Sequence, residues 1–480
     1  MILETHPNST AVIETEFCII GSGPAGITLS LELAKSGRKV FLLEAGGIDD
    51  KNMNLEILGV EEAGIPSYIQ QSRLRYFGGT SGHWAGWCSP LDVEDFHHAK
   101  GMTTEWPIFQ QDLIPYYDIA IKVLNLNDSF FTNGKSIHEQ FFNQSGVTLK
   151  KWQFSTPVAR FGEKFRDEVR KSRNISLLHS APVIDFEMNS SGNSVKSVLV
   201  QGLNGKFTVK AQRYILACGG IENARLLMAS SLKKENPIGD GFKNLGVGFM
   251  EHPHFYEAGK MVFHNSGQNW DGIMDTNTSY RPWQYYLQIH PEIRKKQNWL
   301  NVVVCLHDTE VTENKDAEVL SMFTKNFHRT GSSLKKLQLI CEQEYNPASK
   351  IELKNEKDEL GLNKAKVTWQ LTRRDWKSYH ETLKYLAHSL PSLGLGVLSI
   401  SSDFLEEKLT PLPGAHHMGT TRMGYTSRDG YVDKDLNVFG VYNLSVLGSS
   451  VFSTGGAANP TLSIVALSLR LSAYLLKSRT

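Results

Sequence analysis

A glycine-rich segment near the start of the chain has the residue types of a dinucleotide-binding turn. Gly21-Ser22-Gly23-Pro24-Ala25-Gly26 follows the apolar run Phe17–Ile20, and Glu44 ends a second apolar run. Glycines let a pyrophosphate approach the backbone, a helix N-terminus supplies N–H donors, and an acidic side chain binds ribose hydroxyls. The pattern predicts a dinucleotide site, with an ordinary strand–turn–helix connection as the alternative. It does not distinguish FAD from NAD.

Two neighbouring histidines near the other end of the chain are candidates for proton transfer. His416 and His417 open the segment HHMGT, and Asn459-Pro460 follows later. When a hydride leaves a carbinol carbon, a nearby group must take the hydroxyl proton, and a neutral histidine suits that role. An asparagine can orient the same hydroxyl without titrating. The alternatives are a structural histidine and a helix cap before Pro460.

The elements around these residues must bring the two ends of the chain together. The segment 16–47 predicts strand, turn, helix and strand, although the apolar residues from Ile27 to Leu33 alternate with the period of a strand. Flanking strands and the crossover rule favour the helix. A buried strand is expected at 441–446 and a closing helix at 460–476, with proline at its start.

Between these regions the chain predicts a second unit. Long alternating strands, such as 301–306 and 337–341, indicate an antiparallel sheet, and 377–390 predicts a helix. The expected fold class is α/β (α+β overall): a Rossmann-type nucleotide-binding domain with an inserted antiparallel-sheet substrate domain. The first domain is expected at 13–255 and 412–480, including a loop-rich covering segment at about 70–150, and the substrate-binding domain at 256–411.

Composition excludes several classes of function. The formal net charge is +1, and no basic stripe predicts a nucleic-acid partner. The five cysteines are scattered and form no CxxC pair, which argues against a disulfide framework, a zinc ribbon or an iron–sulfur cluster. No metal site is expected. We also expect no leader peptide, no membrane span and a cytoplasmic location. The oligomeric state stays open.

Several segments, in order along the chain, resemble the glucose–methanol–choline (GMC) oxidoreductases, FAD enzymes that oxidise alcohols and sugars. The resemblance runs nearly end to end. Its segments are GSGPAGITLSLELAKSGRKVFLLEAGG, GGTSGHWAGWCSPLD, ACGGIENARLLMAS, GVGFMEHPH, HHMGTTRMG and NLSVLGSSVFSTGGAANPTLSI. In addition, CEQEYNPASK and LGLNKAKVTWQLTRRD are similar to the bacterial branch near pyranose oxidases and FAD-dependent sugar dehydrogenases.

The resemblance implies FAD as the cofactor and a position for each catalytic group. The family pattern maps the base to His416, with His417 in a supporting role, and the partner to Asn459. The implied reaction is oxidation of CH–OH to C=O on a sugar or glycoside, by proton abstraction and hydride transfer to flavin. The implied cofactor-binding residues are Gly21, Gly23, Pro24, Ala25, Gly26, Glu44, Ala45, Gly79, Thr80, Ser81, His83, Trp84, Val183, Cys218, Gly448, Ser449, Asn459, Pro460 and Thr461.

The resemblance leaves open whether His83 is bonded covalently to the flavin. In pyranose oxidases a histidine at the matching position carries a bond to the 8-methyl carbon, whereas related sugar dehydrogenases need not have one. Gly82 departs from the oxidase pattern, which has threonine there. The alternative is that His83 packs beside the cofactor.

Other readings of the chain also stay open. The substrate is alternatively a non-sugar alcohol or natural-product intermediate, or the chain is a non-oxidative lyase of the same family; an NAD(P) enzyme or a scaffold explains less. The electron acceptor is oxygen, a quinone or a protein. The pair His252 and His254 suggests a metal, but the resemblance places both in a structural turn between domains. Glu342 and Gln343 either reach the substrate or serve structure.

Overall fold

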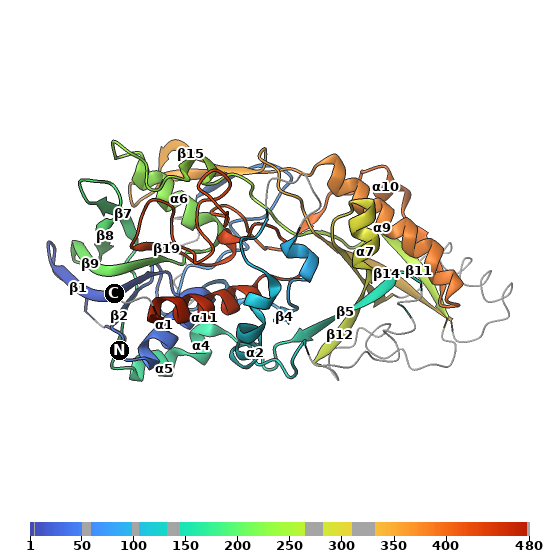
Figure 1. Ribbon diagram of the computed structural model, residues 1–480, viewed down its shortest axis with the longest axis horizontal. Helices are drawn as coiled ribbons and strands as arrows, with labels where there is room; N and C mark the ends of the chain where they lie inside the picture. Colours follow the sequence, from blue (N-terminus) through green and yellow to red (C-terminus); the bar gives the residue numbers. More distant parts are fainter. Residues whose placement is uncertain are drawn as a thin grey trace.

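The computed structural model describes residues 1–3, 5–49, 59–97, 105–131, 142, 145–264, 282–309 and 332–477. Parts of the expected covering segment at 70–150 lie outside these residues. The described chain forms an elongated α/β molecule with two large sheets at opposite ends of its long axis (Figure 1). Within these ranges, no helix is long and apolar enough to cross a membrane.

The first large sheet is built around the predicted strand–turn–helix–strand unit. β1 (Val12–Ile20) pairs in parallel with β2 (Val40–Leu43), because the crossover helix α1 (Pro24–Lys35) returns the chain to the end of the sheet where β1 began. On its other side β1 pairs in parallel with β9 (Gly205–Leu216). The remaining strands are β6 (Ile175–Leu178), β7 (Val183–Met188), β8 (Val195–Gly202) and β19 (Leu444–Val446). The strand order is β6-β2-β1-β9-β8-β7, with β19 pairing in parallel with β9.

Helices cover this sheet and close it with the C-terminal segment. α1 packs against α11 (Thr461–Lys477), and α11 also packs against α2 (Ile114–Val123). α6 (Gly219–Ser231) packs against β7. Figure 1 shows α1 and α11 together on one side of the sheet and α6 on the other. The short helices α4 (Phe161–Lys164) and α5 (Arg166–Lys171) complete this half. The sequence thus predicted the helix at α1 correctly, against its period-two pattern.

The second large sheet is antiparallel and has nine strands among the residues described. Its order is β17-β11-β14-β13-β12-β5-β4, with β10 bridging β14 and β18. Its outer face is covered by α9 (Arg373–Ser392), next to α7 (Pro291–Gln297) and α10 (Ser402–Leu405). The strands are β4 (Trp87–Cys88), β5 (Val147–Phe154), β10 (Pro253–Phe255), β11 (Gly259–His264), β12 (Trp283–Ile289), β13 (Val302–Asp308), β14 (Ser332–Cys341), β17 (Gly396–Ile400) and β18 (Leu412–Pro413).

A small third sheet connects the two halves. β15 (Lys350–Lys357) and β16 (Asn363–Trp369) form a hairpin that pairs with β3 (Val60–Gly64) and packs against α6 of the first half. The second large sheet, in turn, takes β4 and β5 from the segment expected to belong to the nucleotide-binding domain. The two halves therefore exchange segments, and the division of the chain at 256 and 411 stays a prediction.

Candidate functional site

The glycine-rich turn follows β1 and opens α1, and its glycines are required by close backbone approach. Gly21 has φ +103°, and a Cβ atom there would lie 2.4 Å from the carbonyl oxygen of Ala217. A Cβ on Gly26 would lie 1.9 Å from the oxygen of Gly21. These two glycines let the turn fold tightly between β1 and β9.

Glu44 at the end of β2 fastens this turn. Its carboxylate accepts hydrogen bonds from the N–H of Ser22 at 3.1 Å, the hydroxyl of Ser22 at 2.5 Å and the N–H of Gly46 at 2.7 Å. The side chain is buried yet still lines the cavity beside the turn. Glu44 therefore holds the loop in shape in addition to facing the space where a ribose is expected.

One cavity of about 960 Å³ runs from the turn to the second large sheet. Ile20 of β1 and Leu43 of β2 line one end, and His307 of β13 and Gln338 of β14 line the other. Every predicted cofactor residue except Gly26 lines this cavity; Gly26 packs beneath the turn. The space is at the upper end of the range for ligand pockets.

The cavity wall has the features that a dinucleotide needs. A Cβ atom on Gly23, Gly219 or Gly448 would meet no atom within 4 Å, so bare backbone faces open space at these points. The N-terminal residues of α1 and α11, including Pro24 and Thr461, line the same space. Helix N-termini with exposed N–H groups favour anions such as a pyrophosphate. The residues present therefore fit FAD.

His416 lies in a cluster of buried polar groups where the second sheet meets this cavity. Its Nδ1 atom is 2.9 Å from Nδ1 of His252, and the two rings meet edge to face at 77°. Its backbone N–H donates to Oε1 of Glu251 at 2.7 Å, and the N–H of His252 donates to the same oxygen at 2.8 Å. The imidazole of His416 lines the cavity. Glu251 therefore anchors both histidines.

Burial keeps this cluster uncharged. Desolvation lowers the pKa of His416 well below its usual 6.5, lowers that of His252 to about 4 and that of His417 to about 3. Desolvation also raises the pKa of Glu251 to about 8. The 3.8 Å approach of Glu251 Oε2 to His417 Nε2 is therefore not an ion pair at neutral pH. His416 is neutral there, as a general base must be.

Asn459, just before α11, lines the same cavity as His416. Its Nδ2 donates to the carbonyl oxygen of Trp87 at 3.3 Å, whereas its Oδ1 is buried with no hydrogen-bond partner in the described part of the chain. A buried amide oxygen without a partner is costly, so it points to a ligand that donates a hydrogen bond.

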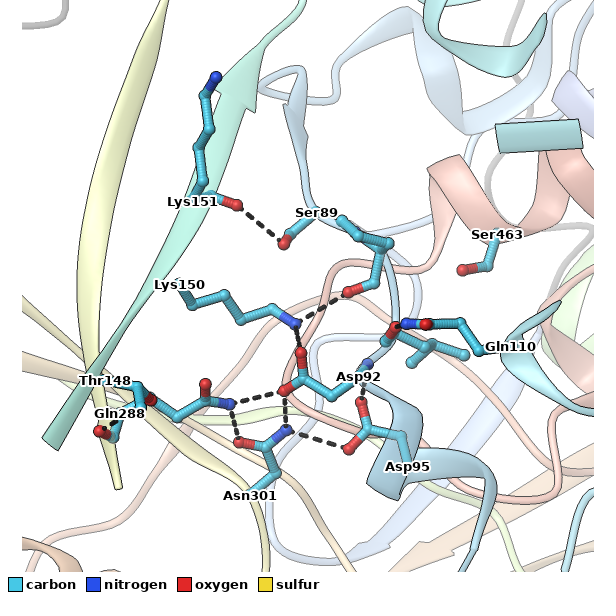
Figure 2. Close-up of polar contacts among 12 residues, drawn as sticks. Ser89, Asp92, Asp95, Gln110, Thr148, Lys150, Lys151, Gln288, Asn301 and Ser463 are labelled. Atoms are coloured by element: carbon cyan, nitrogen blue, oxygen red, sulfur yellow. Dashed lines mark hydrogen bonds and ion pairs between the residues drawn. The ribbon is translucent and has the colours of Figure 1, made fainter. Parts of the chain in front are cut away.

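A buried polar cluster fixes the loop that carries Asn459. Figure 2 shows Asp92, Asp95, Lys150 and Asn301 joined by hydrogen bonds beside β5 and β12. Lys150 Nζ donates to Asp92, and Asn301 Nδ2 donates to both Asp92 and Asp95, at 2.9 and 3.0 Å. The hydroxyl of Thr454 then donates to the carbonyl oxygen of Asp95 at 2.6 Å. The cluster therefore connects the second sheet to the loop before α11.

The second glycine cluster, at 78–86, brings His83 and Trp84 to the cavity. His83 is exposed to this space, and Trp84 Nε1 donates to the carbonyl oxygen of Ala159 at 3.2 Å. A Cβ on Gly82 would lie 1.7 Å from the hydroxyl oxygen of Tyr76. A side chain at this position, where the oxidase pattern has threonine, would therefore displace the ring of Tyr76.

The wall formed by the second sheet includes residues that sequence reasoning missed. His307 Nε2 and Gln338 Oε1 are 2.6 Å apart, and both residues line the cavity with His254 and Tyr256. Nε2 of His254 has no hydrogen-bond partner among the described residues. The alternation of polar and apolar residues along these strands was the only sequence feature that could have indicated a polar face here.

Glu342 and Gln343, which the sequence left between substrate contact and structure, do not line the cavity. Gln343 Oε1 instead accepts from the N–H of Glu251 at 3.0 Å and from Trp369 Nε1 at 2.8 Å. Its role is to hold Glu251 and the small sheet together. Within the described residues, no group of three or more His, Cys, Asp and Glu side chains could hold a metal ion.

The sequence and the structure of this chain are similar to those of several known proteins. Two family models, both described as GMC oxidoreductase, match residues 161–247 and 346–468. The chain is 34% identical over 119 residues to 2-methyl-1,2-propanediol dehydrogenase of Mycolicibacterium austroafricanum, an alignment that covers 25% of this chain and only 21% of that relative. It is 20% identical to the fructose dehydrogenase large subunit of Gluconobacter japonicus, across 98% of this chain and 99% of that one.

Solved structures share the whole fold. Pyridoxine 4-oxidase from Mesorbium loti superposes with a TM-score of 0.60 at 16% identity, covering 97% of this chain and 100% of that one. The Rossmann-type half, the antiparallel half and the order of the matched segments agree with this likeness. The regions 161–247 and 346–468 are similar to the GMC oxidoreductases, a family of FAD-binding enzymes that act on CH–OH groups.

Proposed function

We propose that this protein uses FAD to oxidise a CH–OH group of a sugar or glycoside to C=O, with His416 as the base. The observation that carries the proposal is the arrangement of His416. A neutral imidazole and a buried amide oxygen without a partner, that of Asn459, line one cavity with a glycine-rich dinucleotide turn. The similarity to GMC oxidoreductases supports the same chemistry.

The reaction removes two electrons and two hydrogens from the substrate. The imidazole of His416 takes the hydroxyl proton, and the O–H electron pair forms the second bond of C=O. The hydrogen on the same carbon leaves as hydride with the electron pair of the C–H bond. FAD, when bound, supplies the acceptor for that hydride. Asn459 orients the substrate through a second donor group, because its Oδ1 only accepts and the reacting hydroxyl gives its one proton to His416.

The residues that would hold FAD divide by position along the cavity. Gly23 and the start of α1 would meet the pyrophosphate, and Glu44 the ribose. By resemblance, Val183 would meet the adenine, and Gly448 and Ser449 the ribityl and phosphate part. The loop with Gly79, Thr80, Ser81, His83 and Trp84 would lie along the flavin. Pro460 and Thr461 would direct the positive end of α11 at the ring.

The substrate class rests on the polar wall of the second sheet. His254, Tyr256, His307 and Gln338 present several hydrogen-bonding groups to the cavity. A polyhydroxylated substrate can pair with the groups that the His307–Gln338 bond leaves over and with Nε2 of His254, whereas a simple aliphatic alcohol has too few hydroxyls to do so. One full-length relative is a fructose dehydrogenase subunit. A non-sugar diol is the second candidate, because another relative is a propanediol dehydrogenase.

An anaerobic screen tests the proposal. Purified holoenzyme is mixed with sugars, glycosides and simple alcohols that include diols, and flavin absorbance is followed. Bleaching by a sugar or glycoside supports the proposal, bleaching only by simple alcohols favours the second candidate, and bleaching by neither contradicts both. Admitting air or a quinone after bleaching identifies the electron acceptor. Acid precipitation shows whether His83 holds flavin covalently, since released flavin stays in the supernatant.

A further inference from the structure

We propose that His252 is a positioning residue that fixes the tautomer of His416, so that Nε2 of His416 is the atom that takes the substrate proton. This inference rests on the proposed function for the identity of the base. The hydrogen-bond pattern within the pair stands independently of any substrate. Three contacts carry it: His252 to Gly455, His252 to His416, and Glu251 to both backbones.

The protonation of His252 follows from its contact with Gly455. Nε2 of His252 lies 3.3 Å from the carbonyl oxygen of Gly455. A carbonyl oxygen only accepts hydrogen bonds, so Nε2 must carry the hydrogen. The ring is fully buried, and desolvation keeps it neutral. A neutral imidazole has one N–H, so Nδ1 of His252 has a lone pair.

The protonation of His416 then follows from the 2.9 Å distance between the two Nδ1 atoms. Two lone pairs at this distance would repel, so Nδ1 of His416 must donate its hydrogen to His252. Nε2 of His416 is left with the lone pair. Among the described residues, nothing accepts from or donates to this atom, and its ring lines the cavity. The basic nitrogen is therefore the one free to meet a substrate.

The side chain of Glu251 holds the two histidines in this arrangement. One carboxyl oxygen accepts the N–H groups of both His252 and His416, which fixes the spacing of the two side chains. As His416 takes a proton, its Nδ1–H bond to His252 becomes charge-assisted and strengthens. His252 therefore selects the tautomer of the neutral His416 imidazole. It also stabilises the protonated imidazole that forms during the reaction.

Two substitutions of similar size separate this role from simple packing. In His252→Asn the side-chain oxygen comes near the position of Nδ1 and can still accept from His416. In His252→Gln the amide nitrogen comes near the position of Nε2 and keeps the bond to Gly455, but no acceptor faces His416. Both variants are judged by their FAD content before rates are compared.

We expect His252→Gln to slow anaerobic flavin reduction at saturating substrate by about 10- to 100-fold, with substrate affinity nearly unchanged. His252→Asn should retain a rate within about threefold of the wild-type enzyme. Equal losses in the two variants with FAD retained, or no loss in either, would overturn the inference.

A second measurement needs neither a substrate nor a variant at position 252. Nitrogen-15 spectra of histidine-labelled holoenzyme report which ring nitrogen carries hydrogen, and loss of one resonance set in His416→Gln identifies His416. The inference predicts hydrogen on Nδ1 and none on Nε2. Hydrogen on Nε2 would contradict it. If no alcohol reduces the flavin but the spectra show this tautomer, the proposed function fails and the pairing stands.

Discussion

Nδ2 of Asn459 donates to the carbonyl oxygen of Trp87 while Oδ1 of the same side chain is buried without a partner in the described chain. The bond fixes the amide plane, since only Nδ2 can donate to a carbonyl. The remaining oxygen is therefore an oriented acceptor at the cavity.

Asn459→Ala removes this oriented acceptor and should lower the limiting rate of anaerobic flavin reduction by about 10- to 100-fold, because the substrate loses the contact of a second donor group that aligns it. FAD content and the melting temperature of the variant serve as controls. Stopped-flow absorbance gives the rate. A variant that reduces its flavin as fast as the wild-type enzyme would show that Asn459 does not orient the substrate.

Gly23 tests the cofactor site without disturbing the turn. A Cβ there meets nothing within 4 Å in the protein, so Gly23→Ala should fold normally. The added methyl projects into the space assigned to the pyrophosphate and should weaken FAD binding about tenfold or more, measured by fluorescence titration of the apoprotein. Gly47→Ala is the matched control, because its Cβ would make only a 3.6 Å contact with Asp49 and Gly47 does not line the cavity. Equal affinities in the two variants would place the pyrophosphate elsewhere.

The pH dependence of reduction follows from the low pKa of His416. Burial holds that pKa well below 6.5. The imidazole is therefore still neutral just below pH 6.5 and still able to take the proton of the substrate. Glu251, with a pKa near 8, stays protonated over the same range. The limiting rate of flavin reduction should therefore change little between about pH 7 and about pH 5. A base of ordinary pKa would instead lose about tenfold in rate per pH unit below 6.5, and such a limb in a still-folded enzyme contradicts the assignment.

Gly456 tests the buried polar cluster that holds the loop before α11. Its φ is +56°, and a Cβ would lie 2.4 Å from Oδ2 of Asp95. Gly456→Ala should lower the free energy of unfolding by about 1–3 kcal/mol more than strain at a positive φ alone, because the clash moves Asp95 or the loop. Gly192→Ala is the control for that strain, with φ +70° and open space around the Cβ. Denaturant unfolding of both variants gives the difference, and equal losses would mean that the loop absorbs the methyl group.

The sequence predicted the elements whose signals are local. The turn at Gly21–Gly26, the closing helix at α11 and the strands at β13 and β14 all lie where their patterns place them. The exchange of segments between halves was not predictable in this way, because the pairing of β3 with β16 and of β4 with β5 depends on contacts far apart in the chain.

The same limit applies to the site. His416 and Asn459 were predicted from motif and resemblance, and the structure brings both to one cavity. His252 was predicted to belong to a structural turn. One sequence does not show that this residue, just before β10, places its Nδ1 atom 2.9 Å from Nδ1 of His416. His307 and Gln338 were missed because polar residues alternate on many exposed strands, and only the register of β13 and β14 turns these two toward the cavity.

The role of His416 as the base is tested by comparing His416→Gln with His417→Gln, using the substrate found in the anaerobic screen. His417 is buried, His416 is half-buried at the cavity, and both are neutral, but only His416 is assigned as the base. We expect His416→Gln to bind FAD normally and to reduce it about 10²- to 10⁴-fold more slowly, while His417→Gln stays within about tenfold of the wild-type rate. Flavin reduction at the wild-type rate in His416→Gln would contradict the account.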